Sequence, residues 1–263
     1  MSTIVFLGGG RITAAMLAGL RLAKTKQRLI VHDRNPSKLR NLRKRYAVAV
    51  EPDLKSAVQQ ADVLIVAVRP SSVGELLHSV GQPNRPILAV SLAAAVPLRV
   101  LTKALASPVR WARAMPSPVC RSGRGLTGVT FPQTLPHRDR RRVNDLFASF
   151  GQVIEIPESK FDAFTVTYSC SHGYHALDAL ARAGQAAGLD RQVALVASAH
   201  ALADGICAWR EGKGSLQSLL EEAATPGGIA ATTMAAMDAA GYRRAVGKGV
   251  GAGLRRARAN RRP

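Results

Sequence analysis

The chain has 263 residues, of which 47% are hydrophobic, and a formal net charge of +20 at pH 7. This length accommodates one domain of about 150 residues and a smaller second domain, without metals or disulfides to hold them together. The basic excess lies largely in residues 40–45, 138–142 and 255–262, which have no accompanying aromatic residues. We therefore interpret it as surface charge that attracts an anionic cofactor and substrate, and we do not expect nucleic acid as a partner.

Residues 1–158 alternate between short β-branched runs and helix-like stretches. Strands are predicted at residues 3–7, 28–31, 47–50, 63–68, 87–91 and 109–114. Further strands at residues 125–131 and 152–156, joined by a polar helix over 136–150, could extend the edge of the sheet. Such alternation predicts a Rossmann-like α/β domain with a doubly wound parallel sheet. We assign residues 1–158 to a dinucleotide-binding domain.

A glycine-rich run follows the first predicted strand and leads into a helix: Gly8, Gly9, Gly10, Arg11, Ile12 and Thr13. The glycines let the chain turn sharply and let a pyrophosphate approach the backbone, while the helix N-terminus offers free amides to the phosphates. Nothing larger than glycine is expected to fit well at Gly8 or Gly10. Because Thr13 replaces the third glycine of the usual motif, a purely structural turn is the alternative.

The second predicted strand ends where a βαβ unit places the residues that read the adenosine ribose. Asp33 would accept hydrogen bonds from the free 2′-hydroxyl of NAD(H), whereas Arg34, Asn35 and Lys38 form a donor-rich turn suited to the 2′-phosphate of NADP(H). We favour NADP(H), with NAD(H) as the alternative. Asp33 could also simply pair with Arg34 or cap the next helix.

From about residue 160 the strand patterns stop and the chain becomes rich in alanine and leucine. We assign residues 159–263 to an all-helical second domain for dimerisation and substrate binding, which ends in a basic tail. Apolar stretches such as residues 193–206 need a cover, so we predict a homodimer or higher oligomer through this domain. A monomeric helical bundle is the alternative.

Three cysteines, without a C-x-x-C spacing, favour a reducing cytoplasm over secretion. No apolar run reaches the roughly 18 residues of a membrane span, and the first residues lack the pattern of a signal peptide. We therefore expect a cytoplasmic protein without a membrane partner. We expect no metal site, because His172 and His175 have no further ligand at a suitable spacing.

The order of motifs resembles the pyrroline-5-carboxylate reductase family over nearly the whole chain. Six blocks carry the resemblance: Gly8–Gly10, Asp33–Leu39, Ala67-Val68-Arg69-Pro70, Ser91–Val96 with Ala93, Arg113-Ala114-Met115-Pro116 and Thr225-Pro226-Gly227-Gly228. The resemblance implies an interlocked dimer and the NAD(P)H-dependent reduction of a small anionic cyclic imine, 1-pyrroline-5-carboxylate, to proline. It also implies cofactor contacts at Ala67, Val68, Arg69, Pro70, Ala93, Met115 and Pro116.

The imine carries a carboxylate, for which the turn at residues 225–228 is the candidate binding site. Backbone amides at Thr225, Gly227 and Gly228, at the start of a helix, would bind this anion. A plain helix start after a Pro-Gly turn is the alternative.

The chain departs from the family pattern where protonation of the imine is expected. The family usually carries a threonine after the paired glycines, thought to bond to the imine nitrogen, but Ile229 and Ala230 stand there. We therefore expect Ser171, His172 and His175, close together on a predicted helix, to supply the catalytic proton donor, with a packing role as the alternative. A different imine or carbonyl substrate and a non-catalytic nucleotide-binding protein remain the alternative functions.

Overall fold

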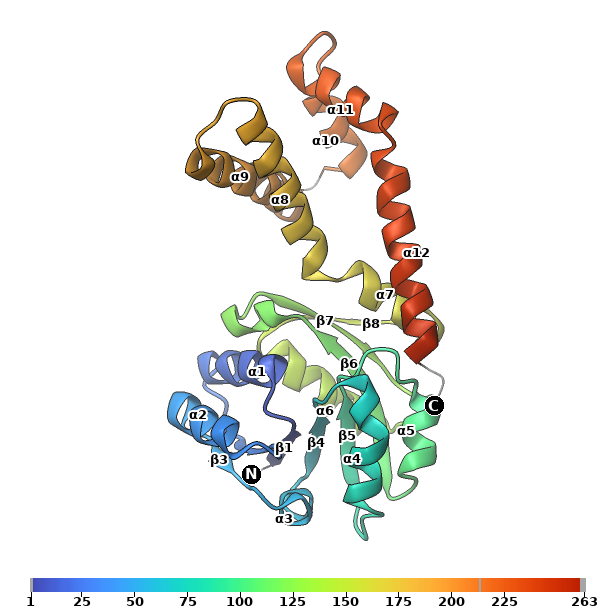
Figure 1. The fold of residues 1–263 in the computed structure, drawn as a ribbon. Coiled ribbons are helices and arrows are strands. Elements are labelled where there is room, and N and C mark those ends of the chain that lie inside the picture. The colour runs from blue at the N-terminus through green and yellow to red at the C-terminus, as the bar shows by residue number, and fades with distance from the viewer. Residues whose placement is uncertain (1, 213, 261–263) are drawn as a thin grey trace. The chain divides into compact units, whose positions relative to one another are not determined.

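The computed structural model describes residues 2–212 and 214–260 (Figure 1). The first half of the chain contains β1 (Thr3–Leu7), α1 (Arg11–Leu22), β2 (Arg28–His32), α2 (Pro36–Tyr46), β3 (Ala49–Val50), α3 (Leu54–Gln59), β4 (Val63–Val66), η1 (Pro70–Ser72), α4 (Val73–Val80), β5 (Ile87–Ser91), α5 (Leu98–Ala104) and β6 (Val109–Pro116). There follow η2 (Pro118–Ser122), β7 (Gly125–Thr130), α6 (His137–Ala148), β8 (Gly151–Glu155), η3 (Glu158–Lys160) and α7 (Phe161–Thr167). The remaining elements of the described chain are helices: α8 (Cys170–Ala186), α9 (Arg191–Glu211), α10 (Leu216–Ala223), α11 (Ile229–Ala239) and α12 (Tyr242–Asn260).

The strands form one sheet in the order β3-β2-β1-β4-β5-β6-β7-β8. The first six strands are parallel and follow the order typical of dinucleotide-binding domains, which confirms the predicted Rossmann-like class. The last two strands do extend the edge, but β7 runs antiparallel to β6. The reason is the short η2 connection, because a parallel neighbour requires a crossover of a dozen or more residues.

Two strand predictions, 47–50 and 63–68, were too long by two residues at one end, each where the chain turns. Ala47 adopts the left-handed conformation, with φ of +49°, and ends α2, so that β3 begins only at Ala49. Strand β4 ends at Val66, since the residues from Ala67 to Arg69 already form the turn that leads into η1. In both segments the local backbone geometry overrides β-propensity.

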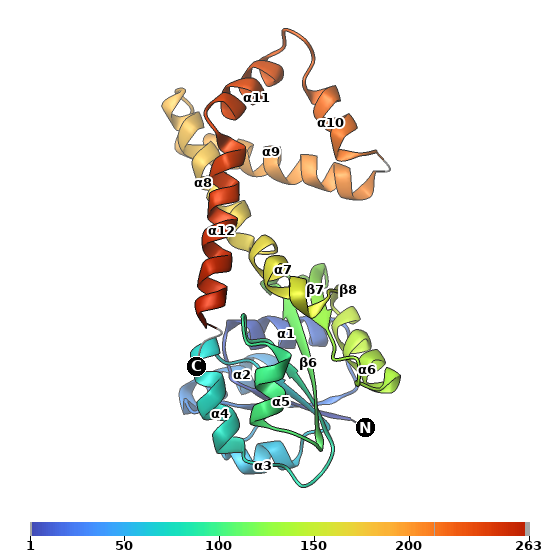
Figure 2. The same ribbon diagram turned by 90° about the vertical axis from the view of Figure 1, so that its right-hand side faces the viewer.

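Hydrophobic cores lie on both faces of the sheet. One face packs against Met16 and Leu17 of α1, with further side chains from α2 and α6. The other packs against Val73 and Leu77 of α4, with further side chains from α3 and α5. Figures 1 and 2 show these helices on the two sides of the sheet. The central strands β1, β4 and β5 are therefore apolar on both faces, as a parallel sheet covered by helices requires.

A buried ionic cluster joins the last parallel strand to the segment that follows the sheet. The guanidinium of Arg113 on β6 is only 1% exposed and lies 3.0 Å from Glu158 and 3.5 Å from Asp162. It also stacks over the ring of Phe161, 4.5 Å from the centroid. The second role of Glu158 is to accept a hydrogen bond from the Leu98 amide. The cluster thus fixes η3 and α7 against strand β6.

Contacts divide the described chain into two compact units. The first extends to Tyr168 and includes the end of α12 from Gly253, and the second comprises residues 169–252. Gly253 lies so close to α7 that an added Cβ would be 2.7 Å from Cγ1 of Val166. Judged by their contacts, η3 and α7 belong to the same unit as the sheet. The predicted domain boundary after residue 158 stays a prediction. None of the described helices combines the length and apolarity required to cross a bilayer.

The second unit is helical and has almost no interior of its own. Helices α8 and α9 pack on each other and bury Ala181, Ala194 and Ser198. The described residues of α10 and α11 include none that is buried. Large apolar side chains are instead exposed, Ile229 to 88% and Ile206 to 56%.

Candidate functional site

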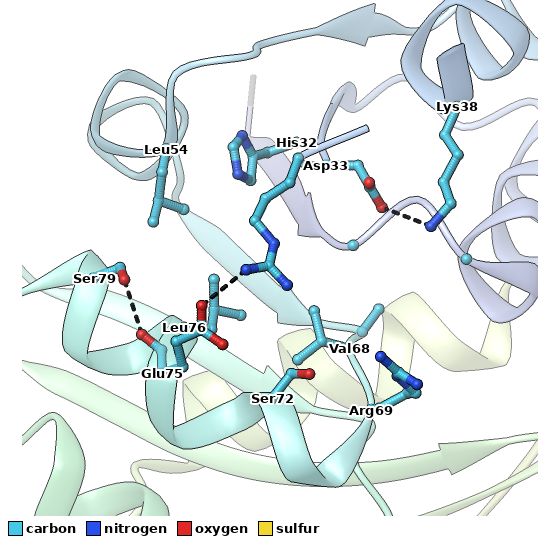
Figure 3. Close-up of a pocket in the computed structure, with 14 residues that line it drawn as sticks. His32, Asp33, Lys38, Leu54, Val68, Arg69, Ser72, Glu75, Leu76 and Ser79 are labelled. Atoms are coloured by element: carbon cyan, nitrogen blue, oxygen red, sulfur yellow. Dashed lines mark hydrogen bonds and ion pairs between the residues drawn. The ribbon is translucent and has the colours of Figure 1, made fainter. Parts of the chain in front are cut away.

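A cavity of about 360 Å³ lies at the carboxyl ends of β1, β2 and β4 (Figure 3). The chain runs outward from β1 to β2 and β3 and then crosses back to β4, so this is the point where the strand order reverses. Doubly wound folds bind their ligands at such a point. The cavity is lined by Gly8, Gly10, His32, Asp33, Arg34, Lys38, Leu54, Ala67, Val68, Arg69, Ser72, Glu75, Leu76 and Ser79.

The glycine loop has a different constraint at each end. Gly8 has φ of +112°, and an added Cβ would lie 2.7 Å from the carbonyl oxygen of Ala67, so the fold itself requires glycine there. Gly10 is the N-cap residue of α1, and an added Cβ would meet no protein atom within 4 Å. The expectation that only glycine fits at Gly10 is therefore wrong for the protein alone. The open space beside Gly10 fits a phosphate group at the first turn of α1.

Thr13 replaces the third glycine of the motif without disturbing the loop. Its side chain is fully buried, and its hydroxyl donates a hydrogen bond to the carbonyl oxygen of Gly8. The Gly8 amide in turn donates to the carbonyl of His32, 2.8 Å away, at the end of β2. The buried Thr13 hydroxyl thus stabilises the turn of the glycine loop.

Asp33 clamps the glycine loop to the end of β2. Its Oδ2 accepts a hydrogen bond of 2.7 Å from the Gly9 amide and lies 3.5 Å from Nζ of Lys38, while its Oδ1 accepts one of 2.8 Å from the Asn35 amide. Burial by itself raises the pKa of the Asp33 carboxyl, but these two amides and Lys38 lower it below its ordinary value. The carboxylate therefore stays ionised, and each of its oxygens already accepts a hydrogen bond from a backbone amide.

Arg34 extends across the cavity instead of pairing with its neighbour Asp33. Its guanidinium donates to Oε1 of Glu75 on α4, at 2.8 Å, and its side chain is 77% exposed. The carboxamide of Asn35 accepts hydrogen bonds from the amides of Ser37 and Lys38 and so caps α2. Arg34 and Lys38 are thus the cationic groups from this turn that line the cavity.

Eight of the predicted cofactor residues line the cavity: Gly8, Gly10, Asp33, Arg34, Lys38, Ala67, Val68 and Arg69. Nine others lie outside its lining: Gly9, Arg11, Ile12, Thr13, Asn35, Pro70, Ala93, Met115 and Pro116. Ala93 follows β5, and Met115 and Pro116 end β6. Because parallel strands end at one edge, these three residues lie along the same edge of the sheet as the glycine loop. Their contact with a cofactor stays a prediction.

Sequence reasoning missed the contribution of α4 and the turn before it to the cavity. Ser72, Glu75, Leu76 and Ser79 all line it. Their spacing of three or four residues places them on one face of a helix, and this pattern was visible in the sequence. His32 lines the cavity as well, although it was not among the predicted cofactor residues, which began in this segment at Asp33. Its Nδ1 lies 3.0 Å from the carbonyl oxygen of Glu51.

The predicted proton donors lie together on the first turns of α8, in the second unit. Ser171, His172 and His175 are all exposed. Ser169 caps the helix, and its hydroxyl oxygen is 2.7 Å from that of Ser171. The shared position at the start of one helix agrees with the predicted i, i+3 spacing, whereas their catalytic role stays a prediction.

The predicted carboxylate site forms a tight turn before α11. Gly227 has φ of +76°, and the Gly228 amide donates to the Thr225 carbonyl oxygen at 2.9 Å. Gly228 is the N-cap residue of α11, and the first turn of this helix has no side-chain cap. The first turn of α11 is therefore open to an anion, whereas anion binding by the amides of Thr225, Gly227 and Gly228 stays a prediction. The amide of Gly228 itself is already engaged within the turn.

The described residues contain no group of three or more His, Cys, Asp and Glu side chains arranged to hold a metal ion. The cysteines Cys120, Cys170 and Cys207 form no disulfide. Burial raises the pKa of the Cys120 thiol to about 11, so this thiol is not an activated nucleophile.

The strand order, the glycine cradle and the cavity at the switch point define a dinucleotide-binding protein of the Rossmann class. Two family models match the chain: NADP oxidoreductase coenzyme F420-dependent over residues 3–95, and pyrroline-5-carboxylate reductase dimerisation over residues 158–260. The pyrroline-5-carboxylate reductase of Synechocystis sp. is 30% identical over 255 residues, which are 95% of each chain. The chain belongs to the pyrroline-5-carboxylate reductase family.

Solved structures of the same family have the same fold. The pyrroline-5-carboxylate reductase of Coxiella burnetii is 22% identical and superposes with a TM-score of 0.89, covering 100% of this chain and 99% of its own. The Plasmodium falciparum enzyme, solved with NADP bound, is 21% identical with a TM-score of 0.87, covering 99% and 98%. The recognition of the family from six motif blocks is thus confirmed.

Proposed function

We propose that this protein reduces 1-pyrroline-5-carboxylate to proline with NADPH and so acts in proline biosynthesis, in the cytoplasm. Its membership of the family over 95% of the chain carries this proposal. The glycine loop supports it, because Gly8 maintains the turn and Gly10 leaves room for a phosphate. A carbonyl or a different imine is the second candidate substrate, favoured by the replacement of the family's threonine with Ile229 and Ala230.

The residues around the ribose end of the cavity favour NADP(H) over NAD(H). A carboxylate that binds NAD(H) accepts from the ribose hydroxyls, and part of this capacity of Asp33 is taken up by the amides of Gly9 and Asn35. The exposed guanidinium of Arg34 and the ammonium of Lys38 can bind a 2′-phosphate. The P. falciparum enzyme, whose structure contains NADP, is in agreement with this preference.

Reduction of the imine requires three things from the protein. A bound reduced nicotinamide supplies the hydride to the C=N carbon. The amides at the start of α11 are assigned to the substrate carboxylate, and they hold the imine in a fixed orientation. Ser171, His172 and His175 on α8 are assigned to proton delivery to the imine nitrogen. Ile229 and Ala230 cannot deliver it, because their side chains carry no proton donor.

The proposal is tested by NADPH oxidation with a panel of substrates. The panel contains 1-pyrroline-5-carboxylate, a cyclic imine of the same ring size without a carboxylate, a six-membered cyclic imine carboxylate, and a 2-keto acid. We expect the highest kcat/KM with 1-pyrroline-5-carboxylate. Turnover only of the keto acid would contradict imine reduction, and cofactor binding without turnover of any substrate would indicate a non-catalytic nucleotide-binding protein.

The variant Arg34→Ala tests the cofactor preference. Because the 2′-phosphate is the group that distinguishes the two cofactors, we expect the KM for NADPH to rise about tenfold, with the KM for NADH changed less than about twofold. Steady-state kinetics with both cofactors measure this difference. Equal increases for the two cofactors would contradict the proposed 2′-phosphate contact.

We further propose a homodimer or higher oligomer formed through the helical unit. Among the described residues of helices α8–α11, only Ala181, Ala194 and Ser198 are buried in the chain by itself. Exposed Trp209 and Ile229 are typical of a surface that a partner covers. The match to the family's dimerisation model over residues 158–260 supports a second copy of the chain as that partner.

Analytical ultracentrifugation tests this assembly. At micromolar concentration we expect a species of at least two chains, and the double charge variant Ile206→Asp, Ile229→Asp should shift it toward monomers and reduce activity in parallel. The charge-matched variant Leu22→Asp, Val100→Asp, on exposed apolar residues of the first unit, should leave the oligomer intact. A fully active monomer of the wild-type chain would rule out a shared active site.

A further inference from the structure

Glu75 on α4 is an acidic residue of the cavity lining, and its carboxylate binds the guanidinium of Arg34 from the turn after β2. Asp33 and Glu75 are the two acids among the residues described as lining the cavity. Asp33 is held by the Gly9 and Asn35 amides. Glu75 projects from α4 toward the turn after β2, and its Oε1 accepts from Nη1 of Arg34 at 2.8 Å (Figure 3).

The pair between Arg34 and Glu75 is exposed, at 77% and 66% of the side chains. Exposed ion pairs change an equilibrium by less than about fivefold, so a stronger anion can displace Glu75. A phosphate dianion forms charge-assisted and bidentate hydrogen bonds with arginine and is such an anion. The displaced carboxylate would then lie near two negative charges on the phosphate, which is unfavourable.

We propose that Glu75 is a positioning residue that sets the discrimination between NADP(H) and NAD(H). It holds the guanidinium of Arg34 extended over the cavity, and it competes with the 2′-phosphate for that guanidinium. NAD(H), which has a hydroxyl in place of the phosphate, leaves the ion pair intact. Glu75 therefore reduces the preference for NADP(H) that Arg34 creates. This inference rests on the proposed NADP(H) preference.

The test measures dissociation constants by calorimetry for NADPH, NADH, 2′,5′-ADP and 5′-AMP, so that the readout does not depend on turnover. In Glu75→Gln we expect the Kd for NADPH and for 2′,5′-ADP to fall roughly three- to fivefold, with NADH and 5′-AMP changed less than about twofold. The gain should shrink at high salt, since the groups are exposed. Glu155→Gln is the control: it also removes one negative charge, but Glu155 lies on β8 and pairs with Arg140.

A double-variant cycle separates competition for Arg34 from a general effect of charge. In the background of Arg34→Ala, the substitution Glu75→Gln should no longer improve the binding of 2′,5′-ADP, because there is no guanidinium to release. Equal gains in Glu75→Gln and Glu155→Gln would overturn the proposal, as would a loss of NADH affinity in Glu75→Gln, which would assign Glu75 to the ribose hydroxyls. If Arg34→Ala affected both cofactors equally, the proposed cofactor preference itself would fail. If Arg34→Ala weakened the binding of NADPH but not of NADH, while Glu75→Gln changed neither, the NADP(H) preference would stand and only the proposed role of Glu75 would fail.

Discussion

Replacing Arg113 with leucine is expected to destabilise the first unit by about 3 kcal/mol, because removal of one partner leaves buried charge uncompensated. Asp162 has only 7% of its side chain exposed, and Glu158 has 34%, so neither carboxylate gains full hydration when the guanidinium is removed. The contact between Arg113 and the ring of Phe161 is lost as well. Urea unfolding at pH 7 measures the change as a lower midpoint with an unchanged slope.

The triple variant Arg113→Leu, Glu158→Gln, Asp162→Asn separates charge from packing. It removes the carboxylates together with the guanidinium, so it should be clearly more stable than Arg113→Leu alone. Arg182→Leu is a further control, because Arg182 and Asp178 form an exposed pair on α8 and should contribute nothing measurable. Equal midpoints for the single and triple variants would show that packing, and not buried charge, makes Arg113 important.

Replacing the histidine that protonates the imine is expected to lower kcat roughly 100-fold or more. We expect this loss in His172→Ala or His175→Ala, since both residues lie at the start of α8 beside Ser171. The pH profile of kcat should also flatten near neutrality, where histidine side chains titrate. His137→Ala, at an exposed histidine of α6, is the matched control and should leave both kcat and its pH profile unchanged.

A second substitution examines the same step from the other side. Ala230→Thr restores a hydroxyl after the paired glycines, so it should favour 1-pyrroline-5-carboxylate over other imines and partly rescue the histidine variant that loses activity. Unchanged kcat and pH dependence in both histidine variants would return α8 to a structural role, with the proton delivered by water or carried by the substrate.

Local patterns in the sequence were sufficient to predict the fold class and the edge of the sheet at which the cavity lies. Alternating β-branched runs and helices predict a parallel sheet, and the glycines after the first strand place the cavity at its carboxyl edge. These features are short-range, because each depends on residues that are close in the chain. Motif order over the whole chain was likewise sufficient to identify the family.

Only the tertiary structure decided which polar groups remain available to a ligand. Asp33 looks in the sequence like a ribose acceptor, but in the structure each of its oxygens already accepts a hydrogen bond, one from the Gly9 amide and one from the Asn35 amide. Arg34 pairs with Glu75, which is 41 residues away in the chain. Gly8 is required by the carbonyl of Ala67 on a neighbouring strand connection, whereas Gly10 faces open space. The contacts of Asp33 with Gly9, of Arg34 with Glu75 and of Gly8 with Ala67 join residues 24 or more positions apart. They form only when the chain folds, so they cannot be read from the sequence neighbours of each group.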